Sequence, residues 1–174
     1  MARLNDRILQ FFRNQGCVII STVDKNGLPH SACKGIVKIN KNGRVYLLDL
    51  YRAKTRDNLR YNAYISITAV DEHKFMGYCL KGKAEMTPRK NIPPAVIRAW
   101  EARIAGRLTQ RLLKNIHEEK GHPRHPEVLL PEPQYMIVVE VKEIVDLTPQ
   151  HLKKEFKHGQ YIRSERNTGN RDSD

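Results

Sequence analysis

The chain has 174 residues, of which 40% are hydrophobic and 29% are charged, a balance that suits one globular domain and excludes a wholly disordered chain. It contains neither a run of about 18 apolar residues nor the hydrophobic region of a signal peptide, so we expect a cytoplasmic protein that does not cross a membrane. An excess of 31 Lys and Arg over 19 Asp and Glu gives a net charge of +12, which attracts anionic molecules without selecting among nucleic acids, phosphorylated metabolites and acidic surfaces.

The first part of the chain predicts a short helix followed by antiparallel strands. Apolar residues recur at helical spacing over 4–14. Residues rich in β-branched and apolar side chains predict strands over 17–23, 29–39 and 44–50. Each gap between these strands contains Asn-Gly, at Gly27 and at Gly43, which is typical of the tight turn of a hairpin. We therefore expect three strands in a meander.

The rest of the chain adds strands and one long helix. A short helix is expected over 53–62, a long amphipathic helix over about 93–117, and further strands over 64–70, 78–86 and 134–145. The total is six strands, without βαβ alternation and without a GxGxxG turn, so the pattern disfavours a Rossmann sheet and favours a small, mainly β barrel with helices. We expect residues 1–148 to form this domain, with the long helix inserted in it, and residues 149–174 to form a polar, basic tail.

Several cations, a hydroxyl group and the start of a helix coincide over 52–58, directly after a strand. Free amide groups at a helix N-terminus favour an anion, and Lys and Arg add charge-assisted hydrogen bonds. The segment is a phosphate site in outline, although a solvated charged turn would have the same sequence. Cys17, Cys33 and Cys79 are far apart in the sequence and form no CxxC motif, so we interpret them as buried, reduced thiols.

Four motifs occur in a fixed order along the chain. They are S-T-V-D-x-x-G-x-P-H over 21–30, G-R-V-Y over 43–46, K-T-x-x-N-L-R-x-N over 54–62 and G-Y-C-L-K-G-K-A over 77–84. Together they resemble the FMN-binding split barrels related to pyridoxamine 5′-phosphate oxidase, closely over about 4–86 and loosely as far as about 145. The C-terminal substrate motif of the true oxidases, with its Trp and Arg, is not recognisable over 142–174, so nothing in the sequence points to pyridoxamine phosphate as the substrate.

The resemblance implies a six-stranded antiparallel split barrel that forms a homodimer, with FMN at two sites between the subunits. The positions that match the phosphate site are Lys54 and Thr55, with Arg52 and Asn58 nearby. The positions that match the segments along the flavin ring are Ser31, Ala32, Cys33, Lys34, Leu48, Asp49 and Leu50. Lys34 would then lie where it can stabilise reduced, anionic flavin.

Two functions of different class follow from this reading. The first is an FMN-dependent oxidoreductase that transfers hydride or electrons to an unidentified small molecule, with no catalytic side chain singled out because the sequence holds no convincing acid–base pair. The second is a binding protein without enzyme activity, for FMN, haem or a deazaflavin. Binding of nucleic acid is disfavoured, since aromatic residues make up only 7% of the chain.

Two further features carry charge or metal-ligating groups. Arg103, Arg107 and Arg111 are spaced as a ladder on the long helix, and we expect them beside the cofactor cleft, where they would select an anionic substrate, or else on a solvated face. Three histidines over 117–125 lie among prolines and glutamates, and we interpret this segment as a polar loop and predict no metal site, because the histidines have no regular spacing.

Overall fold

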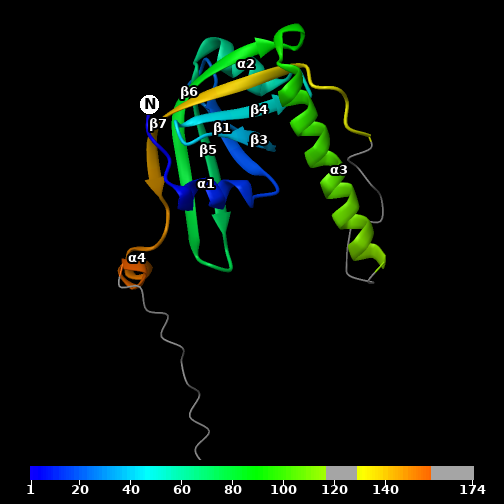
Figure 1. Ribbon diagram of the computed structural model, residues 1–174. Coiled ribbons are helices and arrows are strands. Elements are labelled where there is room, and N and C mark those ends of the chain that lie inside the picture. The colour runs from blue at the N-terminus through cyan, green and yellow to red at the C-terminus, as the bar shows by residue number, and fades with distance from the viewer. Residues whose placement is uncertain (117–128, 158–174) are drawn as a thin grey trace, which may run out of the picture.

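The computed structural model describes residues 1–116 and 129–157, and these form a curled antiparallel sheet with helices around it (Figure 1). All neighbouring strands in the sheet are antiparallel, in the order β2-β1-β5-β6-β7-β4-β3. The fold class is therefore the mainly β split barrel that the sequence predicts, with seven strands among the described residues where six were expected. The elements are α1 (Asp6–Arg13), β1 (Val18–Val23), β2 (Pro29–Lys34), β3 (Ile36–Ile39), β4 (Arg44–Asp49), α2 (Lys54–Tyr61), β5 (Tyr64–Asp71), β6 (Met76–Pro88), η1 (Arg89–Asn91), α3 (Pro94–Ile116), β7 (Tyr135–Asp146) and α4 (Gln150–Lys157).

The hairpin turns form where Asn-Gly predicts them. Gly27 and Gly43 have φ angles of 81° and 79°, a backbone region that costs glycine little and other residues more. The first turn is also held by Asp24, whose Oδ1 accepts hydrogen bonds from the amides of Asn26 and Leu28 at 2.9 and 3.0 Å. These turns fix the registers of β1 with β2 and of β3 with β4.

The strand expected over 29–39 divides at Gly35 into β2 and β3, which lie at opposite edges of the sheet. The chain bends there, so that one continuous segment pairs with β1 on one side and with β4 on the other. A cavity opens at this division, as described below.

The main core lies inside the curled sheet and is closed at one end by α1. Leu4, Ile8, Leu9, Phe11 and Phe12 are all buried, as their helical spacing predicts. Phe11 packs edge-on against Tyr78 of β6, with ring centroids 5.1 Å apart. The helix thus covers an opening of the barrel that the sheet leaves (Figure 1).

The long helix α3 packs its apolar side chains against the barrel along its first half. Val96 packs in a second apolar cluster with Leu48, Ile92 and Met136, and Trp100 lies against this cluster. Leu112 and Leu113 are 48% and 51% exposed, and Figure 1 shows this part of α3 leaving the barrel. The apolar stripe is therefore only partly buried within one chain.

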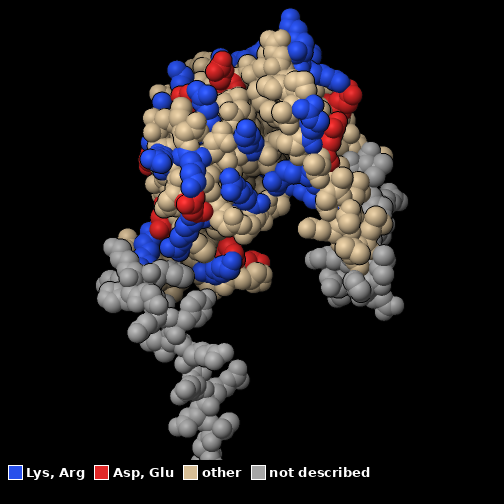
Figure 2. Space-filling view, in the orientation of Figure 1, with Lys and Arg blue, Asp and Glu red and all other residues tan. Residues whose placement is uncertain are grey.

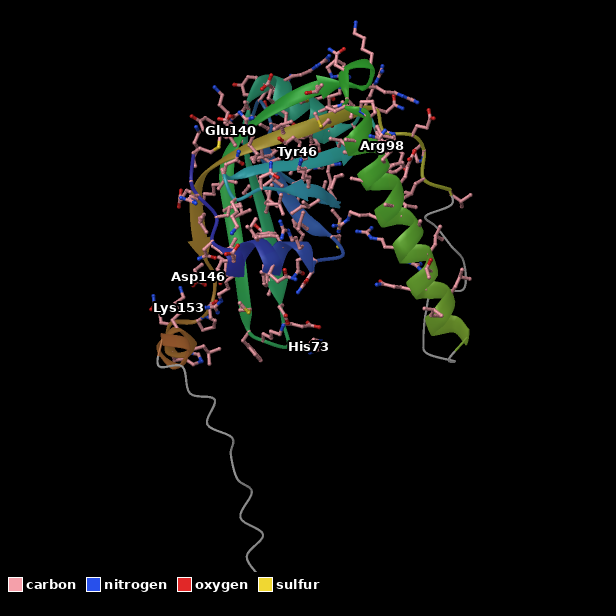
Figure 3. The ribbon with its side chains drawn as sticks, viewed as in Figure 1. Tyr46, His73, Arg98, Glu140, Asp146 and Lys153 are labelled. Carbon is pink, nitrogen blue, oxygen red and sulfur yellow. The ribbon has the colours of Figure 1, made fainter. Side chains whose placement is uncertain are left out.

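The segment after β7 forms a helix, α4, which the sequence did not predict. The Lys153 Nζ atom donates to the Asp146 carbonyl at 3.0 Å, and Figure 3 shows the two residues beside each other where β7 ends. Residues 158–174, the rest of the tail, lie outside the described residues. Among the helices that the structure describes, none is long and apolar enough to cross a membrane.

Candidate functional site

A pocket of about 310 Å³ lies beside the bend at Gly35, where β2 passes into β3, and α3 forms one of its walls. Its floor comes from β3 and the end of β4, and its far wall comes from α3. The lining residues are Cys17, Cys33, Lys34, Gly35, Ile36, Val37, Leu48, Asp49, Leu50, Tyr51, Trp100, Arg103, Ile104, Arg107 and Leu130. The volume is within the usual range for small-molecule sites, and the lining combines apolar side chains with a few charged groups.

A chain of polar groups crosses the floor of the pocket. The Lys34 Nζ atom lies 2.7 Å from Asp49 Oδ2, and the Tyr135 hydroxyl donates to the same oxygen at 2.6 Å. Burial, and secondly the hydrogen bond to the carboxylate, raise the pKa of Tyr135 far above its usual value, so this hydroxyl stays a donor. Asp49 Oδ1 also accepts from the Tyr51 amide at 3.3 Å. The carboxylate is thus fixed on both oxygens.

This pairing changes the role expected of Lys34. Its positive charge is balanced by the Asp49 carboxylate, and the two side chains are 12% and 4% exposed. A balanced pair exerts a weaker field on a ligand than a free ammonium group. The unbalanced positive charge in the pocket comes instead from α3.

Arg103 and Arg107 of the predicted ladder reach the pocket. Arg103 donates to the Gln15 carbonyl at 3.3 Å, and Arg107 donates to the Gly16 carbonyl, so both also hold α3 to the connection between α1 and β1. Figure 2 shows basic side chains gathered between the barrel and α3. Burial, and secondly the neighbouring Arg107, lower the pKa of Arg103 from a value so high that the group stays charged. Arg111 does not line this pocket.

The start of α2 follows the pocket along the chain, directly after Tyr51 and Arg52. Ala53 occupies the N-cap position and makes no side-chain hydrogen bond, so the first amides of the helix have no capping side chain. The Lys54 Nζ atom lies beside this terminus, 3.3 Å from Asp24 Oδ2. An anion placed here would meet free amides, the helix dipole and an ammonium group.

Two of the other three residues of the predicted phosphate set are buried. Thr55 is 4% exposed and Asn58 is 2% exposed. The Asn58 side-chain amide donates to the Thr22 hydroxyl at 3.0 Å, which ties α2 to β1. Arg52 lines a different hollow, on the other side of α2.

Of the residues predicted along the flavin ring, some line the pocket and others do not. Cys33, Lys34, Leu48, Asp49 and Leu50 meet at the pocket. Ser31 and Ala32 do not line it: the Ser31 hydroxyl lies 3.1 Å from that of Ser21 on the outer face, and Ala32 packs against the main core.

The expectation of three buried thiols is wrong for two of them. Cys17 and Cys33 are exposed and Cys79 is half-buried. Cys17 precedes β1, and Cys33 lies on the outward face of an edge strand. A hydrogen bond with Cys17, together with burial, raises the pKa of Cys33.

Several residues in and beside the pocket were not predicted from the sequence. Gly35, Ile36 and Val37 continue the predicted segment past its end, and Trp100 comes from the distant α3. Tyr135 is the first residue of β7, and its contact with Asp49 joins segments far apart in the chain. Gly35 is a local signal that could have extended the segment predicted along the flavin ring from 31–34 to 31–37. No local signal points to Trp100 or Tyr135. The histidines over 117–125 lie outside the described residues.

Residues 4–131 match the family described as pyridoxamine 5′-phosphate oxidase. The chain belongs to the pyridoxamine 5′-phosphate oxidase family. The match covers the barrel as far as the segment before β7 and includes both the pocket and the start of α2. No curated protein matches the sequence.

Solved structures with a similar fold carry different descriptions. HupZ of Group A Streptococcus is 19% identical, with 83% of this chain and 94% of that chain covered and a TM-score of 0.57. A protein of Clostridium acetobutylicum, related to general stress protein 26 and to the pyridoxinephosphate oxidase family, is 15% identical, with 86% and 99% covered and a TM-score of 0.53. HutZ, the heme storage protein of Vibrio cholerae, is 17% identical, with 83% and 94% covered and a TM-score of 0.50. At these identities the likeness shows the fold.

Proposed function

We propose that this family member binds FMN and acts as an oxidoreductase on a small anionic molecule. The observation that carries the proposal is the continuity between the pocket and the uncapped start of α2. Leu50 and Tyr51 line the pocket, and Arg52 and Ala53 lead directly into the helix. A ligand with a planar ring at one end and a phosphate at the other matches this succession of apolar and cationic surfaces.

The residues around the pocket suit a flavin ring. Val37, Leu48 and Trp100 offer apolar surface to the faces of the ring, and the edge of β3 beside Gly35 offers backbone polar groups to its rim. Lys34 pairs with the Asp49 carboxylate, and both side chains line the pocket, where the ammonium group can donate a hydrogen bond to a ligand. Bound FMN would supply hydride or electron transfer.

The start of α2 suits the phosphate group. Its amides lack a capping side chain, and Lys54 contributes an ammonium group that is held near them by Asp24. The buried hydrogen bond between Asn58 and Thr22 fixes the helix on β1, so the amides keep their direction. Asn58 then acts as a positioning residue.

Arg103 and Arg107 support an anionic substrate. They line the same pocket from the side opposite Leu48 and Asp49, and their hydrogen bonds to the α1–β1 connection leave each guanidinium group further donors. A carboxylate or phosphate of the substrate could take these donors.

A homodimer is part of the proposal. On the outer face of the sheet, Ile19, Tyr64 and Val70 are 52%, 68% and 60% exposed, on the paired strands β1 and β5. An apolar face of this kind suits a second copy of the chain. Sedimentation at micromolar concentration should give the dimer mass, and Ile19→Arg should reduce it to that of the monomer. A monomeric wild-type protein that still saturates with FMN would contradict this part.

The phosphate end is tested by titrating flavin fluorescence with FMN and with riboflavin. Lys54→Ala should weaken the affinity for FMN about tenfold, which corresponds to roughly 1.4 kcal/mol, and leave the affinity for riboflavin unchanged, because only FMN carries the phosphate. Lys25→Ala is the matched control, since Lys25 is exposed in the neighbouring turn and its loss changes the net charge equally. Equal effects of the two substitutions on FMN would remove Lys54 from the site.

A further inference from the structure

A second hollow, of about 330 Å³, lies on the side of α2 that faces the end of β6 and the start of β7. Its lining comprises Arg52, Arg56, Arg60, Met86, Pro88, Gln134 and Tyr135. The three arginines are spaced by four residues, so they occupy one face of α2. Lys54 and Asn58 of the same helix contact Asp24 and Thr22 on the β1 side, away from this hollow.

The arginines of this hollow have no acidic partner among the described residues: none forms a described ion pair with Arg52, Arg56 or Arg60. Of the acids nearby, Glu132 pairs with Arg89, and Asp49 holds Lys34 and Tyr135, whereas Asp57 of α2 is exposed and forms no described ion pair with the three arginines. Like charges at this spacing repel each other on a helix. A bound anion would relieve this repulsion.

The rest of the lining narrows the class of ligand. Met86 and Pro88 offer apolar surface, and Tyr135 is buried with its hydroxyl donating to Asp49, which leaves only its ring to face a ligand. Arg56 is half-buried and lines the hollow together with Tyr135, and its positive charge acts to lower the pKa of that tyrosine, against the larger effect of burial. A guanidinium group can donate two parallel hydrogen bonds to a phosphate group, and the apolar wall suits a hydrocarbon group attached to that phosphate.

We propose that this hollow is a second ligand site, separate from the cofactor pocket, that binds a small phosphate monoester with an apolar or aromatic group. The Tyr135–Asp49 hydrogen bond forms the wall between the hollow and the pocket. A ligand can therefore occupy the hollow while the pocket holds another molecule. The site stands on the arginines and the hollow, and does not depend on the identity of the cofactor.

Isothermal titration of the full chain with phenyl phosphate, in about 0.15 M salt, tests the site. We expect saturation at one molecule per chain, and Arg56→Gln should weaken binding by about tenfold or more. Arg98→Gln is the control, because Arg98 is exposed on α3 and does not line the hollow (Figure 3), yet its loss changes the net charge equally. Arg98→Gln should change the affinity for phenyl phosphate less than twofold. If Arg56→Gln does not fold, the exposed Arg60→Gln replaces it.

Repeating the titration with FMN separates this site from the cofactor site. The wild-type protein saturated with FMN should still bind phenyl phosphate, and Arg56→Gln should leave the FMN affinity unchanged. If Arg56→Gln and Arg98→Gln weaken the affinity for phenyl phosphate equally, or if binding does not saturate, the hollow is part of a diffuse basic surface and the proposal is wrong. Competition between FMN and phenyl phosphate would instead make the hollow the cofactor's own phosphate site and overturn a second one. Binding of phenyl phosphate without binding of FMN would support this second site and contradict the proposed function.

Discussion

Replacing Asp49 by Ala should destabilise the protein more than any other single change at the pocket. The carboxylate is buried between the Lys34 ammonium group and the Tyr135 hydroxyl, at 2.7 and 2.6 Å. Its removal leaves a largely buried positive charge without a partner and a buried hydroxyl without its acceptor. Breaking a buried pair in this way costs about 3–5 kcal/mol, a large part of the roughly 5–15 kcal/mol that stabilises an ordinary domain.

Urea unfolding followed by circular dichroism measures this loss, with a melting temperature lowered by about 6–20 °C as an independent reading. Asp49→Asn is the matched variant, because it keeps a hydrogen-bond acceptor for Tyr135 and loses only the charge. Lys34→Met combined with Asp49→Asn removes both charges and should be more stable than the sum of the single effects predicts. A loss below about 1 kcal/mol for Asp49→Ala, or simple additivity in the double variant, would refute the argument that the pair is energetically coupled.

Three further predictions concern the sheet, the tyrosine and the thiols. Gly82→Ala should lower stability by about 1–3 kcal/mol in urea unfolding, because a Cβ at this bulge would collide with the Glu140 carbonyl, and an unchanged midpoint would contradict the close approach. The raised pKa of Tyr135 means that the folded state keeps a proton that the unfolded state releases near pH 10, so the contribution of this tyrosine to stability should be constant below that pH and fall above it, and Tyr135→Phe should weaken the fall in stability at alkaline pH. Because hydrogen bonding to Cys17 raises the pKa of Cys33, iodoacetamide should label Cys33 faster at a given pH after Cys17→Ala, as read by peptide mass spectrometry, and an equal or slower rate would argue against that contact.

Local patterns predicted most of the elements correctly. The buried stripe of α1 and the turns at Gly27 and Gly43 depend on residues close together in the chain, so periodicity and turn chemistry suffice for them. The division of the strand at Gly35 depends on which strands pair with each half, and one glycine does not reveal this. The partial burial of α3 has the same origin, since its stripe shows that a partner surface exists without showing how far that surface extends.

The resemblance predicted that residues from two separate segments share one site. Lys34, Leu48 and Asp49 came from the resemblance and do meet at the pocket. The pairing of Lys34 with Asp49 was not predictable, because it requires the positions of two strands and of Tyr135. Thr55 was predicted in a phosphate site, yet the structure buries its side chain, since a motif gives residue types and the burial of each side chain depends on packing.

The claim that this protein binds FMN is tested most directly by titrating the purified, ligand-free protein with FMN. The titration is followed by flavin absorbance at about 370 and 450 nm and by fluorescence. The proposal predicts saturation at one FMN per chain with a shifted visible spectrum. Absence of saturable FMN binding, with haem giving a stoichiometric Soret band in the same protein, would contradict it and favour a binding protein of another kind.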